Sequence, residues 1–177
     1  MARVINRTQF LRGDFRGTRI PLRPPWSAEE NTFVSLCTRC DDCIRVCPQN
    51  ILLRAQGGFP AVDFLRGECT FCHACADACQ TGALAWHADT LPWRVTPEIG
   101  EECLARRGIF CLTCTEQCMR GAIKLRQQAG RAAQPYIETA ACNGCGACYR
   151  PCPAAAIRIS TSPISDEKNA IAQEVRI

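Results

Sequence analysis

The sixteen cysteines of this 177-residue chain fall into four groups of four, and no other feature constrains the fold as strongly. The first two groups consist of Cys37, Cys40, Cys43 and Cys47, then of Cys69, Cys72, Cys75 and Cys79. The last two groups consist of Cys103, Cys111, Cys114 and Cys118, then of Cys142, Cys145, Cys148 and Cys152. Three groups share the spacing C-x2-C-x2-C-x3-C, whereas seven residues fill the first gap of the third group. A motif repeated in this way predicts a repeated structural unit.

The spacing inside the groups predicts iron-sulfur clusters. Soft thiolate ligands favour iron-sulfur clusters, zinc and copper(I), so the ligand type alone does not decide. Zinc sites use separated pairs of cysteines, whereas C-x2-C-x2-C-x3-C-P is the run found in bacterial two-cluster ferredoxins. Pro48 and Pro153 complete this run in the first and fourth groups. Disulfides would need an oxidising compartment, and residues 1–25 lack the apolar stretch of a cleavable export signal.

The same spacing predicts which cysteines share a cluster. In a two-cluster ferredoxin, three closely spaced cysteines bind one cluster and the fourth reaches the other cluster of the pair. We therefore expect Cys79 to join the first three cysteines of the first group, and Cys47 to join those of the second. By the same logic Cys152 joins the third group, and Cys118 joins the fourth. This scheme predicts four 4Fe-4S clusters with all sixteen cysteines as iron ligands, and His73, inside the second group, is an alternative ligand.

The third group differs from the others because residues 104–110 separate its first two cysteines. We expect this insertion to bulge beside the third cluster without changing the number of its ligands. The expected consequence is a cluster that is more exposed, or more easily lost, than the other three.

The segments between the groups predict short strands. Residues 51–56 and 59–64 flank a Gly-Gly pair, which is typical of a β-hairpin with a glycine turn. Residues 122–126 and 135–138 repeat this plan around a turn that contains Gly130. The two halves of the chain therefore follow one design.

These patterns predict an α+β fold of the tandem bacterial ferredoxin type, with two pseudo-symmetric halves that each bind two 4Fe-4S clusters. Residues 83–87 are a candidate closing strand of the first half, and a proline-containing connection follows over 89–100. The expected organisation is a basic N-terminal arm at 1–30, halves at 31–90 and 98–160, and a polar tail at 161–177.

Composition and motifs narrow the functional classes. The formal net charge of +4 counts the cysteines as neutral, but four clusters with thiolate ligands bring about −8 and leave a net charge of about −4. Nucleic acid is therefore not expected as a partner. No window approaches the roughly 18 apolar residues of a membrane span, so we expect a cytoplasmic protein without one. The sequence has no nucleophile elbow, phosphate-binding glycine loop or dinucleotide fingerprint, so we expect no catalytic residue and no enzyme.

Several local signatures together resemble a known family. They are R-x-x-F-L-R-G at 7–13, Arg-Pro-Pro-Trp at 23–26, C-T-R-C at 37–40 and A-C-N-G-C-G-A-C at 141–148. With the stretched third group, the chain resembles, over residues 5–160, the ferredoxin-type NapF family of cytoplasmic accessory proteins of the periplasmic nitrate reductase. The resemblance implies interaction with the precursor of the reductase catalytic subunit before its export, and a role in supplying or maturing its iron-sulfur cluster.

Three functions therefore stay open from the sequence. The first is a non-catalytic maturation factor that supplies a cluster. The second is a ferredoxin that passes electrons to a redox partner. The third is a protein that holds the precursor until it is ready for export.

Overall fold

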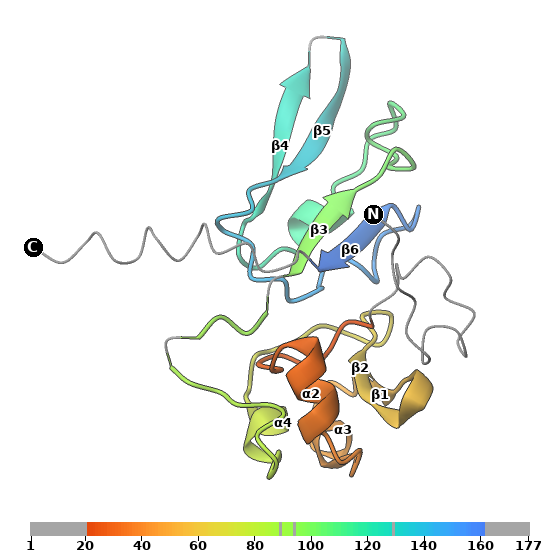
Figure 1. Ribbon diagram of the computed structural model, residues 1–177. Helices are drawn as coiled ribbons and strands as arrows, with labels where there is room; N and C mark the ends of the chain where they lie inside the picture. The colour runs from red at the N-terminus through yellow and green to blue at the C-terminus, as the bar shows by residue number, and fades with distance from the viewer. Residues whose placement is uncertain (1–20, 89, 94, 129, 162–177) are drawn as a thin grey trace, which may run out of the picture. The chain divides into compact units, whose positions relative to one another are not determined.

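The computed structural model describes residues 21–161, apart from 89, 94 and 129 (Figure 1). The chain divides into two compact units. One comprises the chain up to Asp63 together with Cys72–Thr90, and the other comprises Phe64–Phe71 and the chain from Leu91 onward. The second unit thus includes a short segment that lies, in sequence, inside the half predicted at 31–90. Most of the predicted basic arm and of the polar tail lies outside the described residues.

The first unit combines short helices with one hairpin. Its elements are α2 (Glu30–Leu36), α3 (Asp42–Arg45), β1 (Leu52–Arg54), the 3-10 turn η1 (Gln56–Gly58), β2 (Pro60–Val62) and α4 (Ala74–Asp77). Strands β1 and β2 pair antiparallel. Gly57 and Gly58 in the turn have φ angles of 80° and 79°, a conformation that glycine adopts without steric cost. The predicted hairpin is confirmed.

The closing strand predicted at 83–87 is wrong. Leu84 forms a single antiparallel bridge with Ser27, flanked by hydrogen bonds from the N–H of Ala28 to the carbonyl of Ala83 and from the N–H of Ala85 to that of Trp26, and no strand forms here among the described residues. Trp26 has a φ angle of 59°, so the backbone leaves the extended conformation that a longer ladder requires.

Arg23 holds the segment before α2 against the first unit. Its side chain is only 9% exposed. The guanidinium donates to both carboxylate oxygens of Glu30, at 2.9 and 2.6 Å, and to the carbonyl oxygen of Pro60 at 3.1 Å. It also lies 4.9 Å from the ring centre of Phe33 and 5.4 Å from that of Phe59. This part of the predicted arm therefore belongs to the folded unit.

The second unit contains two separate antiparallel pairs. Its elements are β3 (Val95–Ile99), α5 (Thr113–Glu116), β4 (Ile123–Gln128), β5 (Arg131–Ile137) and β6 (Ile157–Thr161). Strands β4 and β5 form the second predicted hairpin, with Gly130 at its turn, and this prediction is confirmed (Figure 1). Strand β3 pairs with β6 and lies where a connection was predicted. The connection was predicted because the segment contains Pro97. Both strands of a two-stranded sheet are edge strands, however, and proline is tolerated in an edge strand.

Buried cysteines form part of the core of the second unit. Cys103, Cys114 and Cys148 pack in one cluster with apolar side chains that include Ile123 and Ile157. Both units are therefore small mixtures of short helices and two-stranded sheets, as the predicted α+β class requires. Among the described residues, no helix is long and apolar enough to cross a membrane.

The contacts of Arg23 predict that Arg23→Lys lowers the free energy of unfolding by about 1–3 kcal/mol, because lysine has no planar fork for the Glu30 carboxylate. Urea unfolding followed by circular dichroism under nitrogen measures this change. Arg45→Lys is the matched control, since Arg45 pairs with Asp42 but its side chain is 65% exposed. Equal destabilisation by both variants contradicts the prediction.

Candidate iron-sulfur sites

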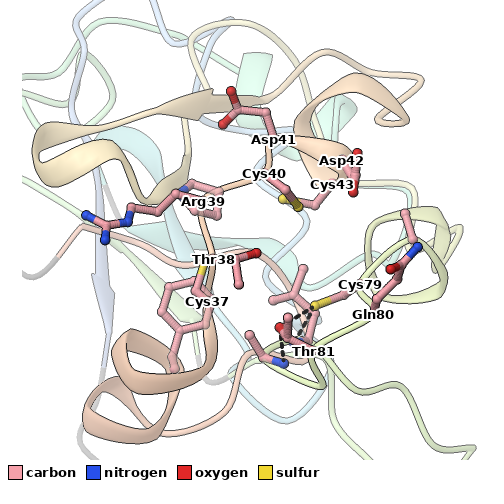
Figure 2. A pocket seen from close by; sticks show the side chains of 15 residues that line it. Cys37, Thr38, Arg39, Cys40, Asp41, Asp42, Cys43, Cys79, Gln80 and Thr81 are labelled. Carbon is pink, nitrogen blue, oxygen red and sulfur yellow. Dashed lines mark hydrogen bonds between the residues drawn. The ribbon is translucent and has the colours of Figure 1, made fainter.

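Four cysteines from two different groups line one cavity of the first unit, with a volume of about 230 Å³. They are Cys37, Cys40, Cys43 and Cys79, and Figure 2 shows them around the cavity. The first of them directly follows helix α2, the third lies within α3, and the last lies two residues beyond the end of α4. The structure thus brings together the quartet predicted for the first cluster, including its member from the second group.

Left-handed backbone turns shape the three regular groups. In each, the second and fourth residues after the first cysteine have positive φ angles: Arg39, Asp41, Phe71, His73, Gly144 and Gly146. For a residue other than glycine this conformation costs about 1–2 kcal/mol, so it persists where the surrounding structure requires it. Sequence reasoning could find this turn only in the fourth group, where glycines occupy both positions.

Burial and neighbouring thiols raise the pKa of the deepest cysteine in the first cavity. The pKa of Cys43 is raised to about 12, by burial first and then by the charges of Cys75 and Cys37. Such a thiol is protonated at neutral pH and binds iron by releasing its proton, so the charge of the metal has to offset the burial. The effect of Cys75 also means that the first two groups meet inside this unit.

In the third group, Cys114 lies within electrostatic range of the three other cysteines predicted for its cluster. Burial raises the pKa of Cys114, and the charges of Cys103, Cys111 and Cys152 raise it further. These four cysteines are the quartet predicted for the third cluster. Cys103 is only 8% exposed, and the greater exposure or lability expected of the third cluster stays a prediction.

The fourth predicted quartet lines a cavity of about 20 Å³ in the second unit, formed by Cys118, Cys142, Cys145 and Cys148. Burial, followed by the charges of Cys145 and Cys142, raises the pKa of Cys148 to about 12. Gly146 lines the same cavity, and a Cβ atom at this position would overlap the ring of Phe64. Glycine is therefore required here both for its positive φ and for this close approach.

The second predicted quartet is divided between the units. Cys47, Cys72 and Cys75 belong to the first unit, whereas Cys69 belongs to the second. Within the second unit, the N–H of Cys69 donates to the carbonyl of Cys145 at 2.8 Å. The joint ligation of one cluster by this quartet stays a prediction.

Hydrogen bonds reach the sulfur atoms of several cysteines. The last cysteines of the second, third and fourth groups each accept a backbone N–H at 3.3 Å, from Leu84, Ala122 and Ala156. Cys79 also lies 3.6 Å from the hydroxyl of Thr81. Burial acts to raise the pKa of Cys79, but these hydrogen bonds outweigh it and lower the pKa. They stabilise the thiolate, which is the form that binds iron.

His73, the alternative ligand, packs between two tryptophans. Its ring stacks on Trp86 with centroids 4.1 Å apart and meets Trp26 edge-on at 5.0 Å. This environment gives the ring a packing role. Sequence reasoning did not predict the stack, because its three members lie far apart in the chain.

The arrangement of the sulfurs fits a cluster. Within the described residues, no three His, Cys, Asp or Glu side chains converge closely enough to hold a single metal ion. In the first unit four thiols instead surround a cavity, as a 4Fe-4S cluster requires when each cysteine binds a different iron. Soft thiolates alone form this donor set, which suits iron-sulfur clusters.

Comparisons with known proteins agree with this chemistry. Residues 36–83 match the model of the 4Fe-4S dicluster domain, and residues 135–158 match that of the 4Fe-4S binding domain. The ferredoxin-type protein NapF of Escherichia coli (strain K12) is 41% identical over 152 residues, which cover 86% of this chain and 92% of the relative. NapF of Haemophilus influenzae is 44% identical over 164 residues, covering 87% and 93%.

The chain belongs to the NapF family of ferredoxin-type proteins. The resemblance inferred from the arginine-rich start and the cysteine groups is confirmed. A more distant relative is the ferredoxin-type protein NapG of Escherichia coli (strain K12), 29% identical over 184 residues, which cover 91% of this chain and 78% of the relative. Membership in NapF and the two domain matches establish a 4Fe-4S protein.

The hydroxyl of Thr81 predicts a specific effect on one reduction potential. In Thr81→Val the Cys79 sulfur loses a hydrogen bond that stabilises the more negative, reduced cluster, so one potential falls by an amount on the order of tens of millivolts. Anaerobic redox titration followed by electron paramagnetic resonance measures it. Thr38→Val is the control, since Thr38 lines the same cavity. An equal shift in both variants would mean that the loss of any hydroxyl from the cavity is enough.

Proposed function

We propose that this protein is a cytoplasmic, non-catalytic accessory factor that holds four 4Fe-4S clusters and supplies iron-sulfur to the catalytic subunit of the periplasmic nitrate reductase before its export. The partner is the unexported precursor of that subunit. Membership in the NapF family supports the connection to the nitrate reductase system. One structural observation carries the donor role: Cys40, at the first cavity, is exposed, while its neighbour Cys43 is buried.

The proposed ligands are all sixteen cysteines in four crossed quartets. For the first and fourth clusters, the shared cavities support this assignment, and for the third, the effects of Cys103, Cys111 and Cys152 on the pKa of Cys114 support it. For the second cluster, the motif spacing supports it. A tandem, pseudo-symmetric arrangement in sequence follows from this scheme, since the first two groups would exchange their last cysteines with each other, and so would the last two groups.

Because Cys40 is exposed, ligand exchange with an acceptor protein can begin at the iron that Cys40 would bind. A thiolate of the acceptor binds an iron while the Cys40 thiolate leaves it, and the proton released by the acceptor thiol is taken up by Cys40. Repeated four times, this exchange moves the cluster with no change in its oxidation state. The raised pKa of Cys43 favours the protonated, iron-free thiol after the transfer.

Electron transfer is the alternative, and a separate observation favours it. Cys75 raises the pKa of Cys43 in the first unit, and Cys114 raises that of Cys148 in the second. In both cases the two cysteines belong to different proposed clusters. Ligands of the two proposed clusters thus lie within electrostatic range of each other, which suits electron transfer between paired clusters.

Double substitutions test the crossed ligation. Cys79→Ala is expected to remove about four of sixteen irons, and adding Cys40→Ala is expected to remove no more, because both residues serve one cluster. Adding Cys75→Ala to Cys79→Ala is expected to remove about four further irons, because that pair serves two clusters. Iron and sulfide analysis after anaerobic purification measures the loss. The reverse pattern contradicts crossing.

Iron transfer tests the function itself. The loaded protein is mixed without oxygen with the cluster-free catalytic subunit, in the presence of a chelator that traps free iron, and iron is measured on both partners after separation. We expect iron to reach the subunit and restore nitrate reduction, because ligand exchange within the complex bypasses the chelator. If iron stays and only electrons cross, the protein is an electron carrier. If the two proteins bind tightly without either transfer, it is an export chaperone.

A further inference from the structure

The insertion in the third group has a fixed shape. The N–H of Gly108 donates to the carbonyl of Ala105 at 3.2 Å, and the N–H of Ile109 donates to that of Leu104 at 2.9 Å. Gly108 is left-handed, with a φ angle of 84°. These two bonds around a left-handed glycine make a Schellman motif, which ends a helical turn. Ala105, 1% exposed, anchors residues 104–110 in the core of the second unit, and we call this segment the insertion turn.

The insertion turn holds two large apolar side chains in solvent. Ile109 is 54% exposed and Phe110 is 76% exposed. In a Schellman motif the residue after the glycine commonly packs back onto the turn, yet Ile109 leaves more than half of its surface in water. Burial of one such side chain contributes about 1.5–3 kcal/mol, and large buried anchors of this kind are typical centres of binding interfaces.

Two arginines, Arg106 and Arg107, precede these apolar side chains in the insertion turn. A groove of about 520 Å³ is formed by the insertion turn and the tip of the β4–β5 hairpin, with Arg106 and Arg107 on one side and Gln134 on the other. No acidic residue lines it among those that the structure describes. Arg106 pairs with Glu101 at 2.5 Å, while Arg107 is exposed and lies within electrostatic range of Glu102, which pairs with Arg158. This combination complements a surface that carries both carboxylates and an apolar pocket.

We propose that the insertion turn is the docking site for an acidic, apolar segment of the protein that accepts the cluster. Phe110 fills an apolar pocket of that segment, and Arg107 meets its carboxylates. The proposal rests on the proposed function, and it adds the site and the chemistry of the partner. Because Cys111 directly follows Phe110, docking brings the partner to a proposed ligand of the third cluster.

Affinity measurements between the loaded protein and the cluster-free catalytic subunit test this proposal. Phe110→Ser and Arg107→Glu are each expected to weaken binding about tenfold or more, with iron content and visible spectrum unchanged. Phe110→Leu is expected to stay within about threefold of the original protein, because it keeps an apolar anchor. Added salt is expected to weaken binding of the original protein and to affect Arg107→Glu much less.

Met119→Ser and Arg150→Glu are the matched controls, since Arg150 is also exposed and lines none of the cavities described above. Met119 is 93% exposed and also follows a proposed ligand, Cys118, but neither residue belongs to the insertion turn. Both variants are expected to bind like the original protein. If Phe110→Ser binds normally, or if it alters only the self-association of this chain, the docking proposal is overturned.

The two proposals fail in different ways. If Phe110→Ser weakens binding but iron never moves from the original protein, the docking site stands and the donor function is wrong. If iron moves equally well from the original protein and from Phe110→Ser, the donor function stands and the docking site is wrong.

Discussion

Cysteines occupy positions that apolar side chains would fill in an ordinary domain of this size, and both units are built around that substitution. Cys43 and Cys148 are buried, and burial is the first cause of their raised pKa values. As thiols they pack like small apolar groups, but as thiolates they need the charge of iron beside them. Folding and cluster binding are therefore linked, because the state that completes the core is the state that holds metal.

Different backbone contacts bring the two ends of each unit together. The second unit pairs β3 with β6 over five residues on each strand. In the described part of the first unit, the corresponding contact is the single bridge between Ser27 and Leu84, next to the left-handed Trp26. Arg23 supplies the missing connection through its hydrogen bonds to Glu30 and Pro60. The Arg-Pro-Pro-Trp signature therefore has a structural explanation in the described part of the segment.

Features that leave a signal in the local sequence could be predicted. Glycine turns predicted both hairpins, and the spacing of the cysteines predicted that Cys79 belongs with the first group. Contacts between distant residues gave no such signal. Pro97 argued against a strand, so the sequence did not predict the pairing of β3 with β6. Residues 64–71 belong to the second unit, where Phe64 approaches Gly146 closely, and no sequence motif indicates this contact. Left-handed Arg39 likewise has no signature, since arginine rarely adopts that conformation.

An insertion between two ligands is tolerated only if both stay in place, and the third group meets this condition in a specific way. Cys103 remains in the core, and the residues after it complete a hydrogen-bonded turn before the chain reaches Cys111. The added residues thus change the surface and leave the quartet intact. Ile109 and Phe110 of this turn lie largely in solvent, whereas Cys103 before it and Ala105 within it are buried. The exposed side chains of the insertion turn can therefore vary without disturbing the packing that holds Cys103.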